Sequence, residues 1–246
     1  MVASKRSFSW LKNVAAVFIV ISLGTWFYSK KTAPNYLVKE TANLIDSVSL
    51  SDGTKIILAK NSSLMYPEKF EGEEREVKLI KGQAFFKVSH DAQHPFNVLI
   101  RKAKVKVLGT SFNINYTHTA INVSVKTGVV RFSPEGKIEP SILTAGQAAS
   151  YNYLQHKITF ANHLNSSSWL TKELKFVDLP LDKVCAELSE YYGVNIILYD
   201  KMQTTKMFNA TFTNSSLDEV LTVLKATYQI KINRKDSLII IKNIHN

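Results

Sequence analysis

The chain has 246 residues, with 31 lysines and arginines against 20 aspartates and glutamates, which gives a formal net charge of +11. Hydrophobic residues make up 45% of the chain, and it contains one cysteine. These values exclude a disordered chain and a disulfide-stabilised scaffold, because the apolar fraction is that of a globular protein and a single thiol has no internal partner. The length allows one or two domains of roughly 100–200 residues each.

Part of the excess positive charge flanks an apolar segment near the N-terminus. The residues from Val14 to Tyr28 carry no charge. A helix rising about 1.5 Å per residue from Phe8 to Tyr28 would be about 30 Å long, which is the thickness of the hydrocarbon core of a bilayer. The sequence therefore predicts a single transmembrane helix over 13–29. The flanking charges are Lys5, Arg6, Lys12, Lys30 and Lys31.

This segment has two competing interpretations, a cleaved signal peptide and a retained anchor. A signal peptide ends in small residues of the Ala-x-Ala kind, whereas this segment ends in Trp26, Phe27 and Tyr28 followed by two lysines. Aromatic residues beside lysines are typical of a helix end at the membrane interface. We therefore expect an uncleaved anchor in the inner (cytoplasmic) membrane. The three basic residues before it favour a cytoplasmic N-terminus, with the bulk of the chain in the periplasm.

Residues 46–160 contain short runs in which apolar and polar residues alternate, separated by turn residues. Lys55–Leu58, Ala84–Val88 and Ile121–Val125 are examples, and Asp52-Gly53 is one of the turns. No amphipathic helix interrupts these runs. The pattern predicts an all-β domain with an antiparallel, sandwich-like architecture.

After a polar linker at 161–171, the spacing of the apolar residues changes from that of strands to that of helices. Residues 176–196 match residues 212–232 without gaps, and each copy reads as strand, helix, strand. We expect residues 172–246 to form a small α+β domain built from two βαβ repeats, with both helices packed on one sheet. Leu238–Ile241 would add a final strand.

Candidate chemistry is sparse. His90 and His94 have the i, i+4 spacing of helical metal ligands, but Pro95 follows at once and strands flank the pair, which indicates an exposed hairpin loop. Cys185 lies on the apolar face of the first predicted helix and is interpreted as a core residue. The sequence thus predicts no catalytic, cofactor-binding or metal-binding residue, no cofactor and no enzymatic activity.

One predicted strand presents a row of lysines. Lys102, Lys104 and Lys106 alternate with small apolar residues. A nucleic-acid surface would combine arginines and stacking aromatic residues with such a row, and these are missing here. We therefore expect a solvated strand face at a sheet edge, with no nucleic-acid binding.

Five motifs in chain order resemble those of the FecR family of transmembrane anti-sigma regulators. The stretch from Trp169 to Lys242 is similar to the C-terminal domain of its Bacteroidetes branch, which is itself similar to the short N-terminal domain of secretins and TonB-dependent receptors. The motifs are Leu50-Ser-Asp-Gly-Thr54, Leu79–Val88, Val105-Lys-Val-Leu-Gly-Thr-Ser-Phe112, Val125-Lys-Thr-Gly128 and Leu143-Thr-Ala-Gly-Gln147.

The resemblance implies a signalling role without catalysis. In such proteins the periplasmic part senses the signalling domain of a TonB-dependent outer-membrane receptor loaded with an iron chelate or glycan. The signal then crosses the membrane and controls an extracytoplasmic-function sigma factor. The expected partners are therefore that receptor domain and that sigma factor.

This chain departs from the family pattern at its N-terminus. Family members usually carry several dozen cytoplasmic residues that bind the sigma factor, whereas this chain offers only a short tail over 1–12. The resemblance therefore supports sensing by the periplasmic part better than it supports binding of a sigma factor by the short tail. The expected organisation is a tail at 1–12, a transmembrane helix at 13–29, a linker at 30–45, a FecR-like β domain at 46–160, a linker at 161–171 and the C-terminal domain at 172–246.

Two alternative functions stay open from the sequence, namely a membrane-anchored periplasmic enzyme acting on glycans and a structural module of the envelope. A glycan-acting enzyme needs two carboxylates about 5–9.5 Å apart, for which Asp52, Asp91 and the acidic cluster at 68–76 are the candidates. For receptor docking we expect backbone pairing at an exposed sheet edge of the C-terminal domain, with Leu238–Ile241 as the candidate strand.

Overall fold

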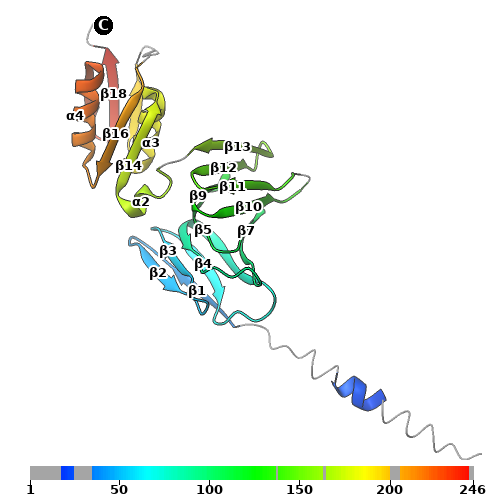
Figure 1. Ribbon diagram of the computed structural model, residues 1–246. Helices are drawn as coiled ribbons and strands as arrows, with labels where there is room; N and C mark the ends of the chain where they lie inside the picture. The colour runs from blue at the N-terminus through cyan, green and yellow to red at the C-terminus, as the bar shows by residue number, and fades with distance from the viewer. Residues whose placement is uncertain (1–17, 25–34, 137, 163–164, 200–205, 244–246) are drawn as a thin grey trace, which may run out of the picture. The chain divides into compact units, whose positions relative to one another are not determined.

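The computed structural model describes residues 18–24, 35–136, 138–162, 165–199 and 206–243 (Figure 1). The chain divides into two compact units, residues 1–35 and residues 36–246. The second unit contains a β domain (β1 to β13) followed by a smaller C-terminal domain.

The expectation of a transmembrane helix is wrong for the part of the chain that the structure describes. Residues 18–24 are helical, and the other residues of the expected 13–29 span lie outside the described residues. Among the described helices, none combines the length and the hydropathy that a membrane crossing needs.

The β domain is one 13-stranded sheet. Its strand order is β11-β10-β7-β6-β5-β8-β9-β12-β13, with β1 to β4 attached beside β5. The strands are β1 (Tyr36–Glu40), β2 (Asp46–Ser49), β3 (Lys55–Leu58), β4 (Ser63–Pro67), β5 (Arg75–Lys87), β6 (Phe96–Ile100), β7 (Ala103–Val107), β8 (Ser111–Tyr116), β9 (Ala120–Thr127), β10 (Val129–Pro134), β11 (Ser141–Thr144), β12 (Gln147–Asn152) and β13 (Lys157–Asn162).

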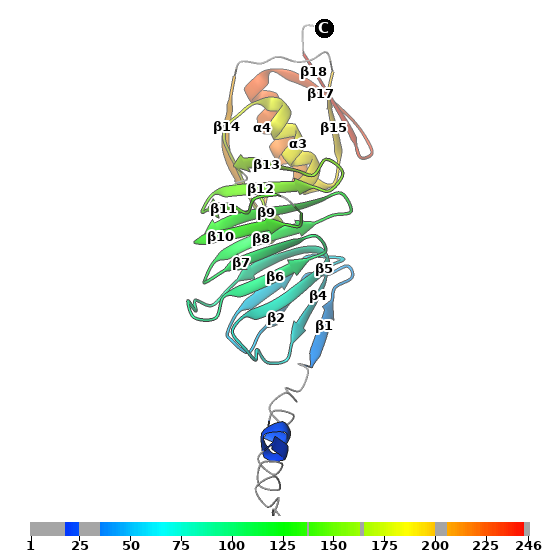
Figure 2. The ribbon, with the colours of Figure 1, turned by 90° about the vertical axis from the view of Figure 1, so that its right-hand side faces the viewer.

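The long strand β5, with 13 residues, connects the two halves of this sheet. Its first half pairs with β4 and β6, and its second half pairs with β3 and β8. The sheet therefore continues through β5 and curls around its own core (Figure 2). The sandwich expectation is wrong in two respects, because one sheet replaces two and because β5 and β6 are parallel.

Gly82 lies where β5 changes partners. Its φ of +83° is a backbone conformation that favours glycine, and an added Cβ would lie 2.7 Å from the Cα of Ser62. The close approach of the β4 strand to β5 therefore depends on the missing side chain.

The buried side chains of the β domain form one apolar cluster inside the curled sheet. Successive residues of each strand face opposite sides, so the alternation in the sequence becomes a core face and an outer face. Phe86 of β5 and Phe112 of β8 stack in this core with their ring centroids 4.9 Å apart.

As described, the C-terminal domain contains a four-residue helix, two longer helices and two small sheets. Its elements are α2 (Ser168–Thr171), β14 (Glu173–Leu179), α3 (Leu181–Tyr192), β15 (Asn195–Leu198), β16 (Phe208–Thr213), α4 (Leu217–Tyr228), β17 (Ile230–Lys235) and β18 (Leu238–Asn243). Strand β14 pairs with β16, whereas β15, β18 and β17 form a separate sheet. In Figure 2, β14 and β15 flank the two helices.

The expectation of two βαβ repeats on one sheet is therefore wrong. A βαβ unit places its two strands parallel in the same sheet, but here the first strands of the two copies pair with each other, antiparallel, as β14 and β16. The second strands, β15 and β17, join the other sheet through β18. The first strands of the two copies thus pair with each other, whereas the second strands share β18 as their common partner, and no strand pairs within its own copy.

Both helices bury their apolar faces in a common core. Leu181, Val184, Cys185 and Leu188 of α3 and Leu217, Val220, Leu221 and Leu224 of α4 are all buried. At the start of α4, the Ser216 side chain accepts a hydrogen bond from the Glu219 backbone and the Glu219 side chain bonds back, which forms a capping box. Burial raises the pKa of the Cys185 thiol to about 12, which suits a core residue and not a nucleophile.

We predict that Gly82→Ala destabilises the protein more than Gly146→Ala does. The two glycines have almost the same φ, +83° and +85°, but nothing lies within 4 Å of a Cβ added at Gly146. Backbone strain alone costs about 1 kcal/mol, and the contact with Ser62 should add about 1–3 kcal/mol to the loss in Gly82→Ala. Urea unfolding of both variants measures the difference, and equal losses would refute the role given to the contact.

Candidate functional site

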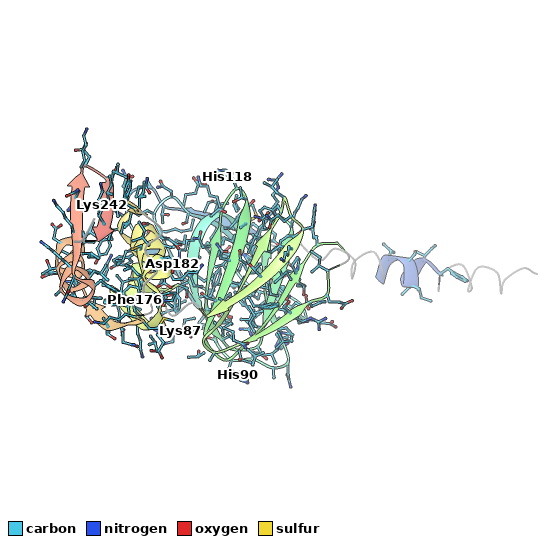
Figure 3. The ribbon with its side chains drawn as sticks, turned by 90° about the horizontal axis from the view of Figure 1, so that it is seen from above. Lys87, His90, His118, Phe176, Asp182 and Lys242 are labelled. Carbon is cyan, nitrogen blue, oxygen red and sulfur yellow. The ribbon has the colours of Figure 1, made fainter. Side chains whose placement is uncertain are left out.

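The two histidines that suggested a metal site lie in the loop between β5 and β6. Because those strands are parallel, the loop is not the hairpin that the sequence indicated. The His94 ring contacts the Asp91 carboxylate at 2.8 Å. His90 and His118 lie on opposite sides of the β domain (Figure 3). In the part of the chain that is described, no group of three or more His, Cys, Asp or Glu residues could hold a metal ion.

Three of the carboxylates considered for a glycan-acting enzyme contact cationic or imidazole groups. Asp52 pairs with Arg75, Asp91 with His94, and Glu74 with two lysines. Hydrogen bonds from His94 lower the pKa of Asp91 to about 2, and the lysines lower the pKa of Glu74. A general acid requires the opposite shift.

The lysine row is not at a sheet edge, contrary to the expectation. Strand β7 pairs with β6 on one side and with β10 on the other. Lys104 and Lys106 are half-exposed and contact Glu74 at 3.2 and 2.8 Å. Lys102 precedes the strand and is exposed. The row is thus an ion-paired outer face within the sheet.

The Arg75 side chain joins the turns that carry the sequence motifs. Its guanidinium is buried and donates hydrogen bonds to the Asp52 carboxylate at 2.7 Å and to the His94 carbonyl at 2.7 Å. It also donates to the carbonyls of Ser89 and Leu108, at 3.0 and 3.4 Å. One side chain thereby holds three turn or loop segments together, since Ser89 and His94 belong to the same loop.

Asp52 is oriented by its own turn. Its carboxylate accepts hydrogen bonds from the backbone N–H and the hydroxyl of Thr54, at 3.0 and 2.7 Å. The Thr54 hydroxyl oxygen in turn accepts from the Ser89 backbone at 3.1 Å. The Asp-Gly-Thr motif is therefore the structural partner of Arg75.

We predict that Asp52→Asn destabilises the protein by about 3 kcal/mol, because removing one partner of a buried ion pair leaves the other charge uncompensated. Only 5% of the Arg75 side chain and 14% of the Asp52 side chain are exposed. The matched control is Asp46→Asn, whose ion pair with Lys39 is much more exposed, so its loss should be at most about 1 kcal/mol. Chemical unfolding measures both, and a similar loss in the two variants would contradict the prediction.

Five polar residues lie side by side across the outer face of the β domain, one from each of five neighbouring strands. Residue pairing places Gln83 beside Asn115, Asn115 beside Asn122, Asn122 beside Ser150, and Ser150 beside Thr159. We call this row the polar ladder. Their chain neighbours Ala84, Ile114, Val123 and Ala149 belong to the buried core, so the ladder occupies the opposite face.

The polar ladder forms one wall of a cavity of about 340 Å³, which we call the junction cavity. The opposite wall comes from the segment Asn165–Trp169 and from helix α3, through Glu187, Glu190 and Tyr191. Asn113 and Ser124 complete the wall beside the ladder. Among the described lining residues there is no lysine, arginine or histidine.

Hydrogen bonds hold the segment after β13 against this wall. The Trp169 indole N–H donates to Asn113 at 3.0 Å, and the Gln83 amide donates to the Ser166 carbonyl at 3.4 Å. The part of the predicted 161–171 linker that is described is therefore packed against the β domain. Trp169, a large aromatic residue in a serine-rich stretch, was the sequence signal for this contact.

Asn165 binds the edge of strand β14. Its amide oxygen accepts from the Lys175 backbone N–H at 2.7 Å, and its amide nitrogen donates to the Lys175 carbonyl at 2.9 Å. The same nitrogen donates to the Glu187 carboxylate. One side chain thus satisfies both backbone groups of Lys175.

Ser124 is buried beside the cavity, and its hydroxyl has no hydrogen-bond partner among the described residues. It lines both the junction cavity and a second cavity of about 210 Å³. The two cavities also share Asn113, Asn165 and Ser166. An unsatisfied buried hydroxyl lowers the stability of the fold by about 1–3 kcal/mol, so the presence of a serine at this buried position needs an explanation.

The polar ladder and the junction cavity were not foreseen from the sequence. The available signal was asparagine on two adjacent strands, since asparagine is depleted in strands. Asn113 and Asn115 alternate in β8, and Asn122 lies in β9.

Comparison with known proteins supplies the family. Residues 39–131 match the model of the FecR protein, and residues 173–241 match the model of the FecR C-terminal domain. The chain belongs to the FecR family. As a FecR-family chain it is an anti-sigma regulator, which implies a sigma factor as partner. The expected boundaries at 46–160 and 172–246 stay predictions.

Solved structures agree with this assignment. Two crystal structures of a candidate anti-sigma factor from Parabacteroides distasonis ATCC 8503, at 2.50 and 1.65 Å resolution, share 27% sequence identity with this FecR-family chain. Each superposes with a TM-score of 0.60 and covers 85% of this chain and 99% of the other. No curated protein matches the chain.

We predict that Asn165→Ala exposes the Lys175 backbone amide to solvent. Losing the hydrogen bond should speed hydrogen exchange at that amide about tenfold, the factor that corresponds to roughly 1.4 kcal/mol. Asn209→Ala is the matched control, because the Asn209 amide also accepts from a backbone N–H, that of Asp178, and donates to the Asp178 carboxylate, both at 2.9 Å. Exchange at Lys175 should stay slow in the control, and unchanged exchange in Asn165→Ala would refute the prediction.

Proposed function

We propose that this FecR-family regulator senses the signalling domain of a TonB-dependent outer-membrane receptor and controls an extracytoplasmic-function sigma factor. Residues 36–246 would work in the periplasm, at the inner membrane. The observation that carries the proposal is the presence of both FecR domains in one chain, at 39–131 and 173–241. The family generally lacks enzymatic activity, which fits a role in binding.

The expected docking strand is wrong in its position. Leu238–Ile241 belongs to β18, which lies between β15 and β17 and has both edges paired. In the described C-terminal domain, β14, β15, β16 and β17 each have one edge that no strand pairs, and Asn165 occupies the β14 edge at Lys175.

Charge distinguishes these edges. Strand β17 carries Lys231, Arg234 and Lys235, and charged side chains on an edge discourage pairing with another strand. The sequences of β15 and β16 contain no charged residue. We therefore propose that the receptor domain adds a strand at β15 or at β16, with affinity from backbone hydrogen bonds.

The test is binding of the purified full chain to the signalling domain of the TonB-dependent receptor encoded beside it, measured by titration calorimetry. We expect a one-to-one complex. Ile197→Lys on β15 or Thr211→Lys on β16 should weaken it at least tenfold, because each places a charge on the pairing edge. Lys231→Gln on β17 is the control and should leave binding unchanged. A wild-type chain that binds no such domain would overturn the proposal.

A further inference from the structure

We propose that the junction cavity binds a neutral, polyhydroxylated ligand, namely one or two sugar units of a glycan. This inference goes beyond the proposed function, because the ligand would bind the regulator itself and at a different surface from the receptor domain.

The charge of the lining selects the class of ligand. Anions such as phosphates and carboxylates are recognised in proteins mainly by arginine and lysine, and the described lining of the junction cavity has neither. Glu187 and Glu190 would instead repel an anion. The lining therefore disfavours anionic chelates and phosphorylated compounds.

The hydrogen-bonding groups of the lining match hydroxyl groups. A side-chain amide offers donors and an acceptor, and a hydroxyl group of a sugar also both donates and accepts. Three amides, Gln83, Asn115 and Asn122, follow one another along the polar ladder, with Ser150 and Thr159 beyond them. Neighbouring strands are about 4.8 Å apart, so the five residues extend over about 19 Å, which exceeds the width of one sugar ring.

Aromatic side chains line the junction cavity together with the polar ladder. Trp169 and Tyr191 both line the cavity. The C–H faces of a sugar ring pack on aromatic rings, which combine an apolar face with a polar edge. Because Asn113 already holds the indole N–H of Trp169 at 3.0 Å, the ring is positioned before any ligand arrives.

Ser124 is the second, independent observation. Its side chain is buried, with 6% of the residue exposed, and its hydroxyl has no hydrogen-bond partner among the described residues. It lines the cavity next to Asn113, its pairing partner in β8. The hydroxyl oxygen is covered as well as unpaired, so a ligand hydroxyl would reach it after rotation of the serine side chain and would then recover the desolvation cost.

The space is adequate for the proposed ligand. The junction cavity of about 340 Å³ falls at the lower end of the range of roughly 300–1,000 Å³ for small-molecule sites. The adjoining cavity of about 210 Å³ shares four lining residues with it, but Lys126 and Lys175 line that cavity, so the neutral ligand is assigned to the junction cavity alone.

The test is a titration of the full chain with defined probes. The neutral probes are maltotriose, cellotriose, xylotriose and N,N′,N″-triacetylchitotriose, the anionic probe is trigalacturonate and the cationic probe is spermidine. Calorimetry measures binding, and tryptophan fluorescence follows Trp169, one of three tryptophans in the chain. We expect at least one neutral trisaccharide to bind and the anionic probe not to bind.

Variants locate the site. Asn115→Ala combined with Asn122→Ala should weaken binding of that trisaccharide at least tenfold, because both residues belong to the polar ladder. Asn233→Ala, an exposed asparagine on β17, is the control and should bind normally. The double variant should still bind the receptor domain, which separates this inference from the proposed function.

Three results would overturn the inference. One is that no neutral probe binds at millimolar concentration, and another is that only spermidine binds, which would indicate a cation site built on Glu187 and Glu190. The third is that a neutral probe binds the double variant as well as it binds the wild-type chain.

Discussion

The buried ion pair between Arg75 and Asp52 is the contact on which the β domain depends. Arg75 begins β5, the strand that belongs to both halves of the sheet. Its guanidinium reaches the turn before β3, the loop before β6 and the turn before β8. These segments lie far apart in the sequence, and loops otherwise have high conformational entropy. A fixed planar cation with several donors can hold all of them at once.

The curled sheet follows from the change of pairing partners along β5, beyond Arg75. Gly82 lets the strand pass close to Ser62, and beyond it β5 exchanges β4 and β6 for β3 and β8. One strand thereby covers two sides of a single core. The outer face of its second half then begins the polar ladder with Gln83. The same strand thus connects the buried ion pair at one end with the junction cavity at the other.

The periodicity of apolar residues predicted the features that depend on residues close together in the sequence. The apolar faces of α3 and α4 were readable because residues three and four apart share a helical face, and Leu181, Val184, Leu217 and Val220 are indeed buried. The pairing of strands was not readable, because it depends on residues that are distant in the sequence. The parallel pair of β5 and β6, the central position of β18 and the two small sheets all belong to this class.

The junction cavity escaped prediction for a related reason. Asn115 and Asn122 look like isolated polar positions until pairing sets them side by side. The transmembrane expectation failed differently. It combined hydropathy and length with the flanking charged and aromatic residues, whereas among the described helices none has the length and hydropathy of a membrane crossing.

Asn165 affects where a further strand can add to the β14–β16 sheet of the C-terminal domain. A two-stranded sheet normally offers two open sides, so it can recruit a strand on each and propagate into a chain of subunits. The amide of Asn165 imitates one residue of a neighbouring strand on β14, which leaves β16 as the free side of that sheet. An added strand on the β14 side would have to displace Asn165, so growth of this two-stranded sheet is favoured at β16.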